Sequence, residues 1–145
     1  MARSDRLWLD SDVILDWLAS RQPWDAAATE IIRRAILGHW ELWFSPLTIA
    51  NVHYVYRKQA GAFKAIAAVR SLVQVGNIAT LCAAHINQAL AVGQRDFEDE
   101  IQIACASGVP GLSAIITRNI ADYMQCAPPA MTAESWLKQN SNLAP

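Results

Sequence analysis

Acidic, amide and hydroxyl side chains recur along this chain at the ends of predicted structural elements, where they could act together. Carboxylates held close together repel one another, and a divalent cation relieves that repulsion. Mg²⁺ prefers oxygen ligands at about 2.0–2.1 Å, and a bound cation can activate water and neutralise charge on a phosphate. Convergence of these side chains would therefore support metal-assisted phosphoester chemistry. They are Asp10, Asp12, Asn51, Asp96, Asp99, Thr117, Asn119 and Asp122.

The charged residues also have purely structural interpretations. Asp10 follows an apolar run, and aspartate is a favoured helix-capping residue. The run Asp96-Phe97-Glu98-Asp99-Glu100 opens a predicted helix, where negative charge meets the positive end of the helix dipole. Asp16 is expected to be solvated on the first predicted helix. Arg57 and Lys58, which end a later helix, are either solvated charges or contacts to phosphate.

Composition limits the class of protein. A chain of 145 residues can form one domain with a real core but not two ordinary ones. We therefore expect a single domain over residues 1–145, with an ordered core at about 6–138 and a polar C-terminal tail. The hydrophobic content of 53% argues against disorder, and the net charge of −1 gives no sign of a strongly basic surface.

The sequence favours a cytoplasmic location. Charged residues surround the short apolar run near the start, unlike a secretory signal. No uncharged apolar run reaches the ~18 residues of a membrane span. The three cysteines, without a Cys-x-x-Cys pair, indicate small buried side chains in a reducing compartment.

Short apolar runs alternate with helical patterns. This alternation predicts an α/β fold with three layers, in which helices cover both faces of a four- or five-stranded parallel sheet. The predicted strands are 6–9, 42–44, 78–82 and 114–117, with a fifth expected at 130–131. The predicted helices are 13–20, 23–37, 46–59, 63–75, 83–92, 97–107 and 133–138.

In such sheets, function gathers at the carboxyl ends of the strands. The first strand ends at Asp10 and Asp12, and the second leads through Ser45 into the helix that carries Asn51. The fourth delivers the segment 117–119, with Asp122 just beyond. Two tryptophans beside the second strand, Trp40 and Trp43, are candidates for a homodimer surface.

Two enzyme classes share part of this pattern but fit it poorly. Haloacid-dehalogenase-type phosphatases also open with a strand and Asp-x-Asp, but they continue with Gly-Thr where Val13-Ile14 stands here. They also need a distal acidic loop and a longer chain. Response-regulator receivers need a phosphate-accepting aspartate at the end of the third strand, where this chain has Cys82-Ala83-Ala84.

Five segments, in this order along the chain, resemble motifs of the PIN domain family, which is best known from VapC-type toxin ribonucleases. Any one match is weak, but together they cover nearly the full length at family-like spacing. The segments are Leu9-Asp10-Ser11-Asp12-Val13-Ile14-Leu15-Asp16, Ser45-Pro46-Leu47-Thr48-Ile49-Ala50-Asn51-Val52, Asp96-Phe97-Glu98-Asp99-Glu100-Ile101-Gln102, Ile115-Ile116-Thr117-Arg118-Asn119-Ile120-Ala121-Asp122-Tyr123 and Met131-Thr132-Ala133-Glu134-Ser135-Trp136-Leu137.

The resemblance implies metal-dependent hydrolysis of RNA with Mg²⁺ or Mn²⁺. It makes Asp10, Asp99 and Asp122 the metal ligands and Asp96 an auxiliary acid. Asn119 would contribute beside Asp122, and Thr117 would be a polar residue near the metal or the scissile phosphate. Arg57, Lys58 and Arg118 are candidate RNA contacts. The implied partners are an RNA substrate, a cognate antitoxin and a second copy of the chain.

Two residues depart from the family pattern. Asp12 stands where Asn or Ser is more usual and adds negative charge. Asn51 stands where catalytic members usually carry Glu, and an amide neither neutralises a cation nor takes a proton. The sequence thus leaves two functions open: a ribonuclease that serves as the toxin of a toxin–antitoxin pair, or a PIN fold without catalysis that binds RNA or protein.

Overall fold

Five parallel strands form one sheet in the order β3-β2-β1-β4-β5. The computed structural model describes residues 4–93, 96–124 and 126–143. The strands are β1 (Asp5–Leu9), β2 (Trp40–Phe44), β3 (Gly76–Ile78), β4 (Ala114–Ile116) and β5 (Ala130–Met131). The helices are α1 (Ser11–Leu18), α2 (Asp25–Ile36), α3 (Pro46–Ala60), α4 (Ala62–Val75), α5 (Ala83–Val92), α6 (Phe97–Ser107) and α7 (Ala133–Gln139), with a 3₁₀ turn η1 (Ile120–Tyr123).

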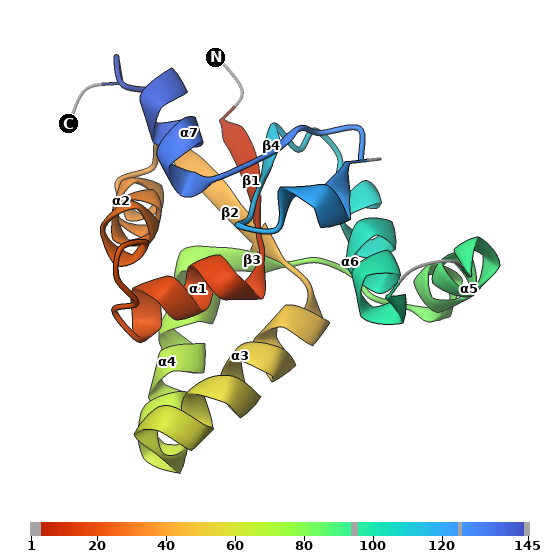
Figure 1. Cartoon of the computed structure of the whole chain (residues 1–145), viewed down its shortest axis with the longest axis horizontal. Coiled ribbons are helices and arrows are strands. Elements are labelled where there is room, and N and C mark those ends of the chain that lie inside the picture. Colours follow the sequence, from red (N-terminus) through yellow and green to blue (C-terminus); the bar gives the residue numbers. More distant parts are fainter. Residues whose placement is uncertain (1–3, 94–95, 125, 144–145) are drawn as a thin grey trace.

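The central strand is buried on both faces, which explains its uninterrupted apolar sequence. Leu7 and Leu9 pack into a core shared with α1, α2, α3, α4 and α7. Trp8 points to the opposite face and packs against Cys105 of α6 and Tyr123 of η1. Figure 1 shows α2 and α7 on one side of the sheet and α6 on the other. The predicted three-layer α/β architecture is confirmed, with five strands.

The third strand lies earlier in the sequence than predicted. The apolar run at 78–82 predicted a strand there, but the strand is Gly76–Ile78, with Asn77 opposite Trp43. Ala79 still donates its N–H to the Phe44 carbonyl at 2.9 Å, and the chain then leaves the sheet. Gly76, which directly follows the predicted helix 63–75, both caps α4 and begins this strand. Helix α2 likewise begins at Asp25 rather than at residue 23.

The cysteines and Trp40 only partly match the burial expected from the sequence. Cys105 is buried as expected, whereas Cys82 is exposed and Cys126 is half-buried. Trp40 is no surface residue, because it lies in the core and donates its indole N–H to the Ile31 carbonyl at 3.0 Å.

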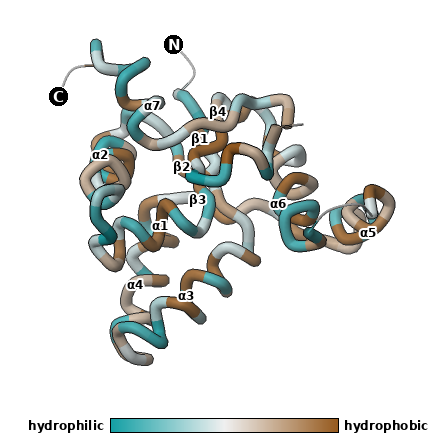
Figure 2. Tube along the Cα trace, viewed as in Figure 1, coloured by the Kyte–Doolittle hydropathy of each residue, from teal (hydrophilic) through white to brown (hydrophobic). Residues whose placement is uncertain are grey.

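Helix α5 packs on α6 away from the sheet, and the tube in Figure 2 shows the apolar residues along it. Within the described ranges, no helix is both long and apolar enough to span a bilayer.

Gly76 has no side chain because the ring of Phe44 occupies the space. A Cβ atom at Gly76 would lie 2.5 Å from Phe44 Cε1 and 3.2 Å from Leu42 Cβ. We expect Gly76→Ala to lower the free energy of unfolding by about 1–3 kcal/mol, the usual cost of overpacking a core. Urea unfolding measures this change.

Gly108→Ala is the matched control for this substitution. Its backbone is also compatible with alanine, and the nearest atom to its added Cβ is the flexible His85 ring at 3.3 Å. A Gly76→Ala protein as stable as the Gly108→Ala protein would contradict the steric argument.

Candidate functional site

The carboxyl ends of β1 and β4 lie side by side, because Leu9 pairs with Ile116. This pairing places Asp10 beside Thr117. The Thr117 hydroxyl donates to Asp10 Oδ2 at 2.9 Å, and the Ser11 N–H donates to Asp10 Oδ1 at 2.8 Å. Asp10 is therefore the N-cap of α1 and is also held from the neighbouring strand. The N–H of Asn119 donates to the Thr117 hydroxyl oxygen at 2.9 Å, which fixes the orientation of that hydroxyl.

A pocket of about 270 Å³ opens beyond these strand ends. Seven of the eight side chains that the sequence singled out line it, while the eighth, Thr117, is fully buried behind Asp10. The seven are Asp10, Asp12, Asn51, Asp96, Asp99, Asn119 and Asp122. They come from the end of β1, from the start of α1, from α3, from the first turn of α6 and its cap, and from the segment after β4. The fold thus brings together residues that the sequence places far apart.

The acids lie close enough to repel one another. Burial, and after it the charges of Asp122, Asp96 and Asp10, raise the pKa of Asp99 to about 6. Burial raises the pKa of Asp12 to about 6, with repulsion from Asp10 as the second cause. Burial also raises the pKa of Asp10, although its hydrogen bonds, led by that from Thr117, oppose the shift. The pocket is therefore a place where negative charge is costly to hold without a counter-charge.

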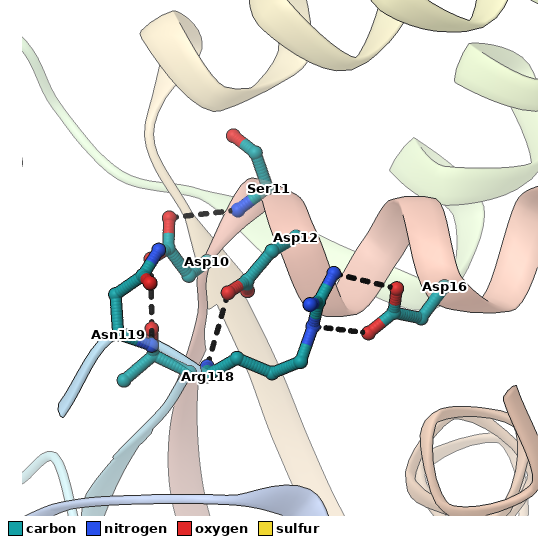
Figure 3. A network of polar contacts seen from close by, with 7 residues as sticks. Asp10, Ser11, Asp12, Asp16, Arg118 and Asn119 are labelled. Atoms are coloured by element: carbon teal, nitrogen blue, oxygen red, sulfur yellow. Dashed lines mark hydrogen bonds and ion pairs between the residues drawn. The ribbon is translucent and has the colours of Figure 1, made fainter. Parts of the chain in front are cut away.

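Arg118 links the segment after β4 to α1 (Figure 3), and it also contacts Trp24 just before α2. Its backbone N–H donates to Asp12 Oδ2 at 3.0 Å. Its guanidinium donates to both carboxylate oxygens of Asp16, at 2.9 and 3.0 Å, and stacks over the ring of Trp24 with its central carbon 3.9 Å from the ring centroid. Asp16 is 1% exposed, so the expectation that it is solvated is wrong. The Arg118 side chain is thus engaged within the protein but is still 29% exposed, and its role as an RNA contact stays a prediction.

A buried polar network that the sequence did not predict joins α3 to α6. The Ser45 hydroxyl, which caps α3, donates to Gln102 Oε1 at 2.8 Å, and Gln102 Nε2 donates to the Thr48 hydroxyl at 3.0 Å. Gln102 also lines the pocket. The network sets α3, which carries Asn51, against α6, which carries Asp99. The detectable signal was spacing, because Gln102 follows Asp99 by three residues and so shares its helix face.

The two other candidate RNA contacts lie away from the pocket. Arg57 and Lys58 are exposed on the last turns of α3, about 9 Å or more along the helix from Asn51. Lys58 Nζ donates to the Tyr54 hydroxyl at 2.7 Å. Neither residue lines the pocket, so their role as RNA contacts stays a prediction.

The side chains at the pocket suit a hard divalent cation by their chemistry. Among the residues that the structure describes, no three His, Cys, Asp or Glu side chains form a ready-made metal site. Mg²⁺ does not need one, because it usually binds one or two carboxylates together with waters and substrate phosphates. Carboxylate oxygens also suit Mn²⁺. Asp12 Oδ1 is buried without a hydrogen-bond partner in the described part of the chain, as expected of an oxygen that a cation would contact.

Solved structures of several toxins share this fold at low sequence identity. Mycobacterium tuberculosis VapC20, described as a sarcin–ricin loop cleaving toxin, aligns with a TM-score of 0.65 at 13% identity, over 81% of this chain and 93% of that one. A toxin–antitoxin complex from Klebsiella pneumoniae aligns with a TM-score of 0.62 at 20% identity, over 88% of this chain and 97% of that one. VapBC2 from Rickettsia felis, bound to a promoter DNA fragment, aligns with a TM-score of 0.65 at 10% identity, over 88% of this chain and 98% of that one.

No curated protein matches the sequence. A family model described as PIN domain matches residues 6–121. The matched range begins at the central strand and extends past β4, so it contains every predicted site residue except Asp122. Because the match spans most of the chain and the strand ends that form the pocket, the chain belongs to the PIN domain family.

Proposed function

We propose that this chain is a metal-dependent ribonuclease that hydrolyses RNA phosphodiester bonds. The observation that carries the proposal is the convergence of Asp10, Asp99 and Asp122 on one pocket, where burial, and after it the charges of neighbouring acids, raise the pKa of Asp10 and of Asp99. PIN and VapC nucleases generally depend on divalent metals, which supports the same reading of the pocket. Mg²⁺ or Mn²⁺ is the proposed ion.

Asp10, Asp99 and Asp122 are the proposed ligands. When bound, the ion supplies an activated water and neutralises charge on the scissile phosphate. The chain's own contribution is orientation: Thr117 and Ser11 each donate to one oxygen of Asp10, which holds the carboxylate in a single arrangement.

Two further residues have supporting roles in this proposal. Asp96 accepts the Glu98 N–H at 2.9 Å and so caps α6, which sets the first turn that carries Asp99. Asn119 donates its N–H to Thr117 and lines the pocket beside Asp122. Arg57 and Lys58 are proposed to meet RNA phosphates along α3, whereas Arg118 acts through its main chain on Asp12.

Metal binding provides the first test. We expect Mn²⁺ titration to show one site on the wild-type chain, and Asp10→Asn or Asp99→Asn to weaken its affinity roughly 100-fold, because each removes a negative ligand. Cleavage of a labelled RNA should fall in parallel. Electron paramagnetic resonance of free Mn²⁺ and gel analysis of the RNA provide the two measurements.

Asp5→Asn is the matched control for these variants. Asp5 lies on the same strand but at its opposite end, about 16 Å from Asp10. It accepts a hydrogen bond from the Ser113 hydroxyl, which asparagine can also accept. Wild-type Mn²⁺ binding that neither Asp10→Asn nor Asp99→Asn reduces would refute the nuclease proposal.

A binding module without catalysis is the second candidate, and Asn51 favours it. Asn51 lines the pocket where an acid would complete the ligand set, and its amide cannot replace that charge. RNA binding that persists in EDTA, without any Mn²⁺ site or cleavage, would support this alternative.

The proposed setting is the toxin half of a toxin–antitoxin pair in the cytoplasm. Structures of toxin–antitoxin complexes from Klebsiella pneumoniae and Salmonella typhimurium share the fold and support an antitoxin partner. A small DNA-binding protein encoded beside this gene that binds the chain and blocks RNA cleavage would favour this setting. A homodimer is also proposed, and light scattering of the purified chain tests it.

A further inference from the structure

Asp12 and Asn51 line the same pocket from different helices. Asp12 lies in the first turn of α1, and Asn51 lies in the second turn of α3. One position carries an acid where the PIN pattern usually has an amide or hydroxyl, and the other carries an amide where that pattern usually has an acid. The two departures cancel, so the pocket has as many carboxylates at these two positions as the PIN pattern would give it.

The contacts of Asp12 do not match those of an ordinary helix-start acid. Such an acid is stabilised by the helix dipole and by water. Here Oδ2 accepts the Arg118 N–H at 3.0 Å, while Oδ1 is buried and has no hydrogen-bond partner among the described residues. A buried carboxylate oxygen without a partner is costly, and a bound cation would remove that cost.

The position of Asp12 is held from outside the pocket. The Arg118 N–H that binds it belongs to a residue whose guanidinium is anchored by Asp16 and stacked on Trp24. One carboxylate oxygen is therefore held by the protein, and the other forms no hydrogen bond within the described part of the chain.

We propose that Asp12 is an additional ligand of the divalent cation and supplies the negative charge that Asn51 cannot. This inference rests on the proposed nuclease function and deepens it. It makes the pair Asp12 and Asn51 an exchange: the acid stands on the helix after β1 and the amide on the helix after β2, and the pocket keeps its charge.

Four proteins test the exchange: wild type, Asp12→Asn, Asn51→Glu and the double variant Asp12→Asn/Asn51→Glu. We expect Asp12→Asn to weaken Mn²⁺ binding at least tenfold, because the amide keeps the acceptor for Arg118 but loses the charge. The double variant should return to within about threefold of wild type. RNA cleavage should follow the same order. Electron paramagnetic resonance of Mn²⁺ gives the affinities, and circular dichroism verifies folding.

Asp5→Asn and Asp10→Asn separate the outcomes. Asp5→Asn should bind Mn²⁺ as the wild type does. Binding that survives Asp12→Asn within twofold but is lost in Asp10→Asn overturns the exchange and leaves the nuclease proposal standing. A wild-type chain that binds no Mn²⁺ overturns both. A weakened Asp12→Asn protein that Asn51→Glu fails to restore overturns the exchange, because the two positions would then not substitute for each other.

Discussion

Arg118→Met is expected to lower the free energy of unfolding at neutral pH by about 3–5 kcal/mol, the usual cost of breaking a buried ion pair by removing one partner. The reason is Asp16, whose side chain is 2% exposed and would keep its charge without a counter-ion. Methionine retains much of the apolar contact with Trp24, so the loss is mainly electrostatic. Urea unfolding followed by tryptophan fluorescence and circular dichroism measures the difference.

A double-mutant cycle isolates the ion pair from other effects. With Asp16 already changed to Asn, removal of Arg118 should cost much less, because no buried charge is left unpaired. The exposed pair of Arg33 and Glu30 is the comparison, since the Arg33 side chain is 48% exposed and Arg33→Met should cause only a small fraction of the loss. Equal losses from Arg118→Met in the wild-type and Asp16→Asn backgrounds would contradict the argument.

The metal-free chain is expected to lose stability as the pH rises from 4.5 to 7. Asp12 has an ordinary pKa of 3.8 and a folded pKa of about 6 because of burial and of repulsion from Asp10. Between these values the unfolded chain has already released its proton while the folded chain still holds it, so deprotonation favours unfolding. At about 1.4 kcal/mol per pKa unit, Asp12 alone contributes a loss of about 2–3 kcal/mol.

Asp99 acts in the same direction, because its pKa is also raised to about 6 by burial and by neighbouring acids. Glu30 does not interfere, because its ion pairs with Arg33 and Arg34 lower its pKa to about 2 and so act at lower pH. Urea unfolding in EDTA at several pH values measures the slope. Asp12→Asn should make the slope shallower, and a metal-free stability that stays flat or rises over this range would refute the prediction.

The misplaced third strand shows why local pattern did not locate every element. The run Ile-Ala-Thr-Leu-Cys at 78–82 is more apolar than the Gly76–Ile78 segment that pairs with β2. The register of this edge strand depends on the Phe44 ring, which lies over Gly76, a contact between residues distant in sequence. The central strand was located correctly because burial on both faces leaves a continuous apolar run in the sequence itself.

The incorrect prediction that Asp16 is solvated has a related cause. Helical spacing places Asp16 on α1 but does not reveal what packs against that face. Its partner Arg118 lies 102 residues later in the chain. The network of Ser45, Thr48 and Gln102 was missed for the same reason, since it joins two helices that meet only in the folded protein.

The sequence by itself determined the α/β class, the position of each candidate acid at the end of a strand or the start of a helix, and the resemblance to the PIN family. These features depend on residue type and short-range spacing, which the amino-acid sequence gives directly. Only the tertiary structure decided which acids share a pocket, that Asp16 is buried against Arg118, and that Asp12 has one oxygen held and one without a partner among the residues that the structure describes. Burial and charge repulsion depend on distances through space, and those distances exist only once β1, β4, α3 and α6 have packed together.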